Sequence, residues 1–312
     1  MPAMSDQAVV IWGELLWDQF PDGPQLGGAP SNVAWHLGMA GGWAQLVSRV
    51  GNDELGHRAI DRLSEIVDTS LIQVDPERAT GEVEVTVVDP ADPAEPGQLH
   101  LRGEPRYRLV PGRAWEHIAC SSDVATAIGE AGVLIFGTLA QHTPGGLAQW
   151  KRAIAAAGSR CLKVCDLNLR RTMTPPAGER EAVLAALEVA DLLKVNDQEL
   201  AKLGEWLGWS DPIAELRKRP RVVAITHGAE GSTLHGERGT IEIPGVPARE
   251  KGDNVGCGDA YLAILVHGMT LGWDLEHSAR AASRWAAEVA AVRGATPAFD
   301  DAQIEELLGE AA

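Results

Sequence analysis

The sequence predicts an α/β fold in which helices cover both faces of a parallel β-sheet. From residue 133 onward, short apolar segments of strand length alternate with helical segments, which is the order of repeated β-α-β units. These strand segments are apolar throughout, as expected for strands that are buried on both faces. With 312 residues and 45% hydrophobic side chains, the chain can bury a sizeable core.

The first part of the chain begins this pattern. An apolar strand is predicted at 9–12, a second strand at 44–50, and a helix with 3.6-residue periodicity at 55–66. Between the two strands lies a glycine-rich turn, Gly27-Gly28-Ala29-Pro30, and a helix over 32–39 starts directly after it.

Residues 81–112 have a different texture. Glu82–Val88 alternates charged and β-branched side chains, the period of a strand with one face in water. A turn rich in Pro and Asp follows at 89–97, and 98–110 is a second strand region. We expect antiparallel strands here that stand outside the main sheet.

The rest of the chain supplies the remaining strands and helices. Strands are predicted at 133–136, 162–165, 192–195, 222–225, 232–234 and 240–243. Helices are predicted at 146–157, 180–190, 198–207 and, rich in Ala, near 258–271 and 275–292.

The charge balance excludes several classes of function. Lys and Arg number 27 against 44 Asp and Glu, so the net charge is −17. Such a chain repels nucleic-acid backbones and anionic membrane surfaces, and it can hold an anion only through local devices such as helix N-termini and a few placed Arg or Lys. The apolar run at 260–271 is too short to span a bilayer, 1–10 resembles no export signal, and the four cysteines form no disulfide framework. We expect a cytoplasmic protein with neither nucleic-acid nor membrane partners.

Polar residues follow four of the predicted strands at the point where each strand ends. They are Gly137-Thr138, Asp166 to Arg170, Asn196 to Glu199, and Thr226 to Gly228. In an open parallel sheet, ligands bind outside the carboxyl ends of the strands. Four polar strand ends in register therefore favour one site along this edge.

The sharpest local motif is Asp253-Asn254-Val255-Gly256-Cys257-Gly258-Asp259, which runs directly into an apolar helix. Glycines at a helix N-terminus let the backbone amides point outward, and with the helix dipole they form an anion-binding site. A carboxylate in the first turn, Asp259, can take a proton from a hydroxyl that attacks a phosphoryl group. From this segment alone, an ordinary capped helix start with glycines for close packing remains the alternative. Neither a P-loop nor a Rossmann glycine fingerprint is present.

Together the motifs resemble the ribokinase/PfkB family of sugar kinases, in family order and over nearly the whole chain. Asp253–Asp259 is similar to the family's second signature, in which Thr-Thr and Ala usually stand where this chain has Asn254-Val255 and Cys257. The other matching segments are Gly13–Asp18, Gly27–Ala34, Val50–Gly56, Asn196–Glu199 and Thr226–Gly231. The resemblance implies a ribokinase-like parallel sheet sandwiched by helices, with a small β-sheet lid. The core would comprise residues 1–12, 27–80 and 113–312, and the lid residues 13–26 and 81–112.

The resemblance also implies roles for individual residues. Asp259 would be the catalytic base, and the amides of Gly256, Cys257 and Gly258 would bind the transferred phosphoryl group. The sugar would contact Asp18, Gly28, Asn32 and Arg170. Arg170 could grip an acidic sugar or supply positive charge to phosphate, and it is alternatively a surface arginine. The nucleotide would contact Asn196, Glu199, Thr226, Gly228 and Gly231.

Two cations follow from the same comparison. Glu199 would hold Mg²⁺ through water, and Asp253 is the candidate ligand of a monovalent cation such as K⁺. Cys257 has two interpretations: a small residue tolerated in place of Ala, or a reactive thiol whose pKa is lowered at the helix N-terminus.

The predicted function is an ATP-dependent sugar kinase that uses Mg²⁺ and transfers the γ-phosphoryl group of ATP to a primary hydroxyl of a free sugar. The motifs look most like those of fructokinases, so fructose is the first substrate expected. A 2-keto-3-deoxygluconate kinase and a ribokinase are the alternatives, and a sugar- or nucleotide-binding regulator without turnover is the alternative from another class. A homodimer through the lid is a further expectation.

Overall fold

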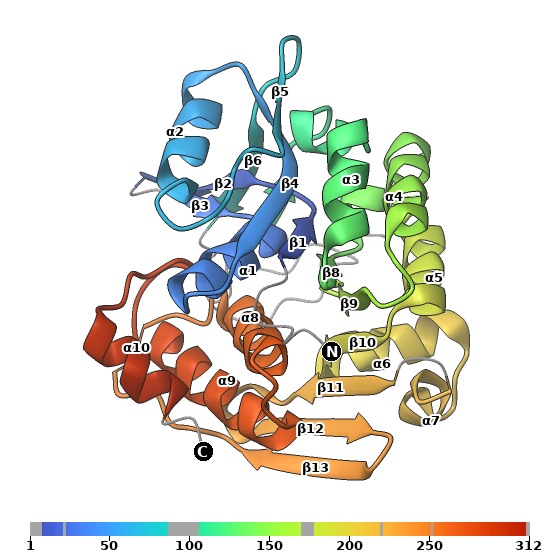
Figure 1. Cartoon of the computed structure of the whole chain (residues 1–312), viewed down its shortest axis with the longest axis vertical. Helices are drawn as coiled ribbons and strands as arrows, with labels where there is room; N and C mark the ends of the chain where they lie inside the picture. Colours follow the sequence, from blue (N-terminus) through green and yellow to red (C-terminus); the bar gives the residue numbers. More distant parts are fainter. Residues whose placement is uncertain are drawn as a thin grey trace.

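The computed structural model of the chain describes residues 8–20, 23–86, 106–169, 178–218, 221–250 and 252–309. A nine-stranded sheet runs through the molecule in the order β13-β12-β11-β10-β9-β8-β1-β4-β5 (Figure 1). Its strands are β1 (Val9–Trp12), β4 (Ala44–Gly51), β5 (Ile72–Asp75), β8 (Val133–Phe136), β9 (Leu162–Asp166), β10 (Leu192–Asn196), β11 (Val222–Thr226), β12 (Gly231–Gly236) and β13 (Gly239–Pro244). All neighbours pair in parallel except β11–β12 and β12–β13, which are antiparallel.

Helices cover both faces of this sheet. One face carries α1 (Ala29–Met39), α2 (Glu54–Leu63), α8 (Cys257–Thr270), α9 (Leu275–Ala290) and α10 (Asp301–Leu308). The other carries α3 (Ser122–Glu130), α4 (Pro144–Ala156), α5 (Glu179–Val189) and α6 (Asp197–Leu207), with α7 (Pro212–Leu216) beside α6.

The central strand shows why uniformly apolar segments form this sheet. Val9 and Ile11 of β1 belong to the hydrophobic cluster on the α8 face, whereas Val10 and Trp12 belong to the cluster on the α4 face. Each of these side chains is at most 2% exposed. Since successive side chains of a strand point to opposite faces, a strand between two helical layers must be apolar at every position.

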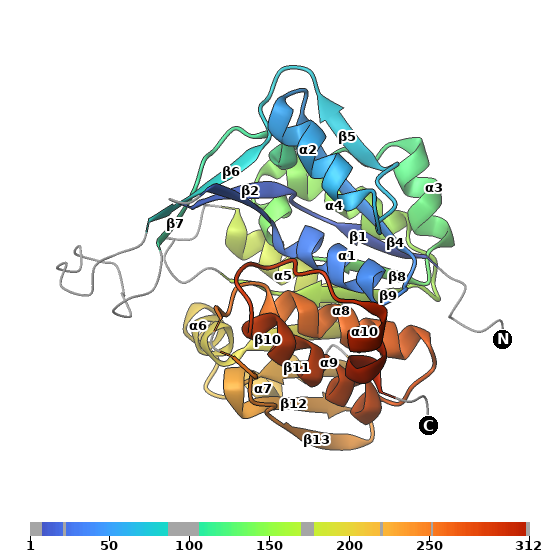
Figure 2. The same cartoon turned by 90° about the vertical axis from the view of Figure 1, so that its left-hand side faces the viewer.

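A second, four-stranded sheet stands apart from the first, in the order β3-β2-β6-β7. It is formed by β2 (Leu16–Phe20), β3 (Gly23–Gly27), β6 (Gly81–Thr86) and β7 (Arg106–Leu109), and Figure 2 shows it extending to one side of the main sheet. β6 and β7 pair antiparallel, and β6 lies parallel to β2. Leu16 and Val83 pack together on one face with Phe20 and Leu109.

These observations confirm the predicted ribokinase-like α/β architecture with its small accessory sheet. Much of the second strand region expected at 98–110 lies outside the described residues, and β7 begins at Arg106. No strand was predicted at β5, and no helix at α3 or α10. β5 is four residues long and lies at the sheet edge, and α10 has eight residues with only Leu307 buried, so neither has a strong apolar pattern.

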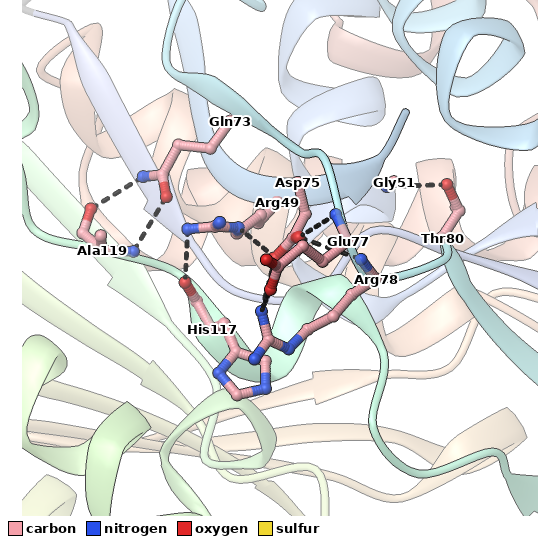
Figure 3. A network of polar contacts seen from close by, with 9 residues as sticks. All are labelled: Arg49, Gly51, Gln73, Asp75, Glu77, Arg78, Thr80, His117 and Ala119. Carbon is pink, nitrogen blue, oxygen red and sulfur yellow. Dashed lines mark hydrogen bonds and ion pairs between the residues drawn. The ribbon is translucent and has the colours of Figure 1, made fainter. Parts of the chain in front are cut away.

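A polar network fastens the junction between the two sheets (Figure 3). Asp75, at the end of β5, accepts the backbone amides of Glu77 and Arg78 and pairs with the guanidinium groups of Arg49 (2.9 Å) and Arg78 (3.3 Å). The Thr80 hydroxyl then accepts the amide of Gly51 at 2.9 Å. The segment that leads from β5 into β6 is thereby held against the end of β4.

No helix within the described parts of the chain is long and apolar enough to cross a membrane.

Candidate active site

The polar strand ends predicted from the sequence lie together at one edge of the main sheet. Asp166 of β9 is in register with Lys194 of β10, and Asn196 of β10 is in register with Thr226 of β11. A cleft of about 580 Å³ opens over this edge. The predicted nucleotide contacts Asn196, Thr226, Gly228 and Gly231 line it, with Cys257 and Gly258 of the glycine motif.

The N-terminus of α8 enters this cleft through a turn that requires glycine. Gly256 is the N-cap of α8 with φ of +78°, and a Cβ atom there would lie 2.7 Å from the Cα and Cβ atoms of Ala295. Asp253 braces the turn, since its carboxylate accepts the amides of Val255 (3.0 Å) and Gly294 (3.1 Å). A helix start leaves the amides of its first turn without partners inside the helix, so the position of α8 is compatible with the anion site that the motif predicts.

The segment behind Gly256 is tied to α1 by buried ring nitrogens. Trp285 donates its indole N–H to Nδ1 of His36 at 3.1 Å, which leaves Nε2 of His36 to donate to the carbonyl of Ala295 at 2.9 Å. Burial lowers the pKa of His36 to about 4, and the bond to Ala295 only partly opposes this, so the ring is neutral at pH 7.

Asp259 and Asn32 come together from opposite ends of the sequence. The amide nitrogen of Asn32, in the first turns of α1, donates to Oδ2 of Asp259 at 2.8 Å. Asn32 is 5% exposed, and its Oδ1 atom is buried without a hydrogen-bond partner among the described residues. The predicted base and a predicted sugar contact therefore share one hydrogen bond, with one buried acceptor left over.

The glycine-rich turn that precedes α1 packs against Asp18. Gly28 has φ of +101° and packs on the Glu14 carbonyl, where a Cβ atom would lie 2.5 Å from the oxygen. The half-buried Asp18, on β2, places its carboxylate so close to Gly27 that any side chain there would overlap it. Asp18, Gly28 and Asn32 thus all belong to one turn and its neighbouring strand.

The Asn-x-x-Glu motif is a helix cap as well as a lining of the cleft. Oδ1 of Asn196 accepts the amides of Gln198 and Glu199, and the Glu199 carboxylate accepts the amide of Asn196 at 2.8 Å. Glu199 is 5% exposed and lies behind Asn196 rather than on the lining of the cleft. Within the described ranges, no group of three or more His, Cys, Asp and Glu side chains is placed to hold a metal ion.

Lys194 was not predicted as a site residue, and neither was its pairing with Asp166. The Nζ atom of Lys194 lies 2.9 and 3.1 Å from the two carboxylate oxygens of Asp166, and the residues are 5% and 3% exposed. Burial by itself would lower the pKa of Lys194, but the carboxylates of Asp166, Glu199 and Asp259 raise it, so the side chain is a buried cation. The signal was present: Lys194 is the one charged residue in the strand Leu192–Asn196.

Two predicted residues need separate comment. Arg170 lies outside the described residues. For Cys257, burial and the nearby charges of Asp259 and Asp253 raise the pKa of the thiol to about 12. The interpretation as a reactive, acidified thiol is therefore wrong, because the carboxylates and the loss of water outweigh the helix N-terminus.

Comparison with known proteins identifies the family. The model of the pfkB family carbohydrate kinases matches residues 108–302, more than half of the chain. This chain belongs to the PfkB family of carbohydrate kinases. Its relatives include an uncharacterized sugar kinase of Pyrococcus horikoshii, 28% identical over 88% of this chain and 84% of the relative. A fructokinase of Klebsiella pneumoniae is 29% identical over 83% of this chain and 84% of the relative.

A solved structure gives the same fold for this PfkB kinase. The fructokinase of Vibrio cholerae, crystallised with fructose, ADP and calcium, superposes with a TM-score of 0.80 at 23% identity, covering 98% of this chain and all of the other. The likeness extends over both sheets, so the small sheet is part of the shared fold. The family assignment and the sequence-based resemblance agree.

Proposed function

We propose that this PfkB kinase transfers the γ-phosphoryl group of ATP to a primary hydroxyl of a free sugar, with fructose as the first candidate. One observation carries the proposal: Asp259 lies in the first turn of α8, beside the anion-binding amides, and is hydrogen-bonded to Asn32 at 2.8 Å. A base, an anion site and a sugar-binding amide thus meet at one point. The sugar and ADP in the related Vibrio fructokinase support the same pair of ligands.

The chemistry follows from this arrangement. Asp259 accepts the proton of the sugar hydroxyl as the new oxygen–phosphorus bond forms and the bond between the γ-phosphorus and the ADP oxygen breaks. The amides of Gly256, Cys257 and Gly258 stabilise the charge on the transferred group. Products are the sugar phosphate, ADP and one proton, which leaves through Asp259.

The sugar would be oriented by Asp18, Gly28 and Asn32. Asp18 accepts hydrogen bonds from sugar hydroxyls, and the buried Oδ1 of Asn32 gains the donor that it lacks among the described residues. A buried acceptor that only the ligand satisfies favours a hydroxyl over an apolar group at that point. Arg170 stays a proposed contact of the sugar.

The nucleotide would occupy the cleft lined by Asn196, Thr226, Gly228 and Gly231. The Glu199 carboxylate does not line the cleft, so it would hold Mg²⁺ only through water, beside the cleft-lining Asn196. Such an arrangement suits Mg²⁺, because Mg²⁺ prefers hard oxygen ligands and keeps several waters. When bound, Mg²⁺ neutralises phosphate charge. Asp253 fits a monovalent cation such as K⁺, since each of its carboxylate oxygens accepts one amide and keeps a further lone pair.

The small sheet would serve as a lid over the sugar, with residues 13–26 and 81–112 as the lid and 1–12, 27–80 and 113–312 as the core. Closure of such a sheet excludes water that would otherwise hydrolyse ATP. A homodimer through this lid is also proposed. The lid carries exposed charged side chains, such as Arg108 and Glu84, which form an ion pair of 2.7 Å within the chain.

The test is ADP release from Mg-ATP with fructose, ribose, 2-keto-3-deoxygluconate and adenosine, with and without K⁺. Turnover of fructose above the others supports a fructokinase, and preference for another sugar moves the assignment to 2-keto-3-deoxygluconate kinase or ribokinase. Asp259→Asn should lower kcat at least ~10²-fold while sugar and ATP still bind. ATP binding without turnover of any sugar would favour the non-catalytic regulator.

A further inference from the structure

We propose that Lys194 is the fixed positive charge of the phosphoryl-transfer centre, held by Asp166 beneath the N-terminus of α8 so that its ammonium faces the terminal phosphate. The inference deepens the proposed function and rests on it. It assigns a role to a buried ion pair that the helix-cap and sheet geometry alone leave unexplained.

The placement of the ammonium is the first argument. Lys194 lines the cleft that also contains Cys257 and Gly258. A Cβ atom on Gly258 would lie 2.8 Å from Nζ of Lys194, so the ammonium lies directly against the backbone of the anion-binding turn. Only a glycine leaves room for this approach without displacing the lysine.

Hydrogen-bond capacity is the second argument. An ammonium has three N–H donors, and the two oxygens of Asp166 engage at most two of them, at 2.9 and 3.1 Å. With at least one donor left and the cleft beside it, Lys194 can contact a phosphate oxygen while Asp166 keeps the side chain in one position. Such a preorganised donor costs no reorganisation during the reaction.

The third argument is the charge that the site must manage. The carboxylates of Asp166, Glu199 and Asp259 all act on Lys194. These carboxylates would oppose a nucleotide polyphosphate in a chain that already has a net charge of −17. One buried cation beside Asp166 reduces that repulsion where the phosphoryl group passes.

Two pair variants test this inference against a matched control. Lys194→Met with Asp166→Asn removes the pair without leaving a buried charge, and Lys163→Met with Asp191→Asn removes a Lys–Asp pair from the opposite end of the same strands, where the groups lie 3.8 Å apart. Each protein is measured for thermal unfolding, kcat, KM for the sugar, and affinity for ATP and adenosine. Asp166→Asn alone, which keeps the ammonium, is the third variant.

The Lys194/Asp166 pair variant should lower kcat about 10²-fold, as removal of one preorganised donor does, with KM for the sugar and affinity for adenosine within ~3-fold. Its ATP affinity should fall at least ~10-fold more than its adenosine affinity. In Asp166→Asn alone, the losses of kcat and of ATP affinity should be much smaller. The control pair should match the wild type. The proposed role would be overturned if the Lys194/Asp166 pair variant kept a kcat and an ATP-to-adenosine preference within ~3-fold of those of the control pair variant. It would also be overturned if Asp166→Asn alone lost as much kcat and ATP affinity as the pair variant does.

The ATP-to-adenosine comparison keeps the two proposals separable. If the wild type turns over no sugar, the proposed function fails, yet selective loss of ATP affinity in the Lys194 variant would still support the phosphate-facing charge. If the wild type is active and the variant keeps both its rate and its ATP preference, the inference fails and the proposed function stands.

Discussion

Replacing Asp75 with asparagine tests the network that joins the two sheets. The Asp75 carboxylate is 1% exposed, and one oxygen accepts the amides of Glu77 (2.9 Å) and Arg78 (3.0 Å). The other oxygen faces the guanidinium groups of Arg49 and Arg78 (Figure 3). Asparagine keeps an oxygen that accepts from the two amides. Its NH₂ group, however, is a donor that would face the guanidinium groups of Arg49 and Arg78, which are donors too.

The expected loss can be estimated from the partners. A hydrogen bond to a charged group contributes about 1.5–3 kcal/mol, so the contact with Arg49, whose side chain is 22% exposed, should contribute about 2 kcal/mol. Arg78 is 37% exposed and its contact is longer, so solvent reduces its share to about 1 kcal/mol. We expect Asp75→Asn to lower the free energy of unfolding by about 3 kcal/mol at pH 7.

The pH dependence has a definite sign. Burial alone would raise the pKa of Asp75, but the amides of Glu77 and Arg78 and the charge of Arg49 lower it below its ordinary value of 3.8. The unfolded chain therefore binds the proton more readily, and the contribution of Asp75 is fully present above about pH 4 and is lost as the pH falls through the folded pKa. The difference in the free energy of unfolding between the wild type and Asp75→Asn should stay constant from pH 7 to pH 5 and narrow only below pH 4.

Urea unfolding of both proteins across this range measures the effect. Asp68→Asn is the control, because the carboxylate of Asp68 is held by Gln45 and Ser70 rather than by arginine, and it should cost less than ~1 kcal/mol. A loss below 1 kcal/mol for Asp75→Asn, or a stability difference that already narrows between pH 7 and pH 5, would show that the contacts with Arg49 and Arg78 contribute little to stability.

Three further results are expected. Gly256→Ala should destabilise the fold by about 1–3 kcal/mol more than Gly41→Ala and lower kcat, because both glycines have positive φ but only Gly256 packs against Ala295; equal urea midpoints for the two variants would contradict this. The pKa of His36 is lowered to about 4, so between pH 6.5 and pH 4 the unfolded chain binds the proton more readily than the folded one. Over this range the free energy of unfolding of the wild type should fall by about 3 kcal/mol relative to that of His36→Gln, and parallel pH–stability curves would be the opposing result. Cys257, with a pKa of about 12, should react with iodoacetamide at pH 8 far more slowly in the folded protein than in urea, and labelling at the rate of a free thiol would show that the burial argument fails.

The main sheet was predictable because its strands obey one strong rule. Segments such as Val133–Phe136 are buried on both faces of the sheet, and a segment that is hydrophobic at every position predicts this burial. β5 escaped prediction because an edge strand with only its ends buried, Ile72 and Asp75, lacks such a signal. Its role depends on Arg78, three residues further along the chain, and on Arg49, which the pairing of β5 with β4 brings to Asp75.

The site divides in the same way. Gly256, Gly258 and Asp259 lie within four successive residues, so a local helix start is enough to bring them together. The contact between Asn32 and Asp259 joins residues 227 positions apart, and only the resemblance to a family placed them in one site. Lys194 was missed because a lone lysine in an apolar strand acquires meaning only when the neighbouring strand places Asp166 in register with it.

Charge explains how so acidic a chain can serve a polyanionic substrate. The net charge of −17 disfavours anion binding over the surface at large. The structure places the opposing features at one edge of the sheet, where the N-terminus of α8 lines the cleft and Lys194 lies against Gly258. Because a field of this kind acts over a few ångströms in a partly buried site, it is screened far less by salt than surface charges are. Affinity for ATP should accordingly depend on these local groups rather than on the net charge of the chain.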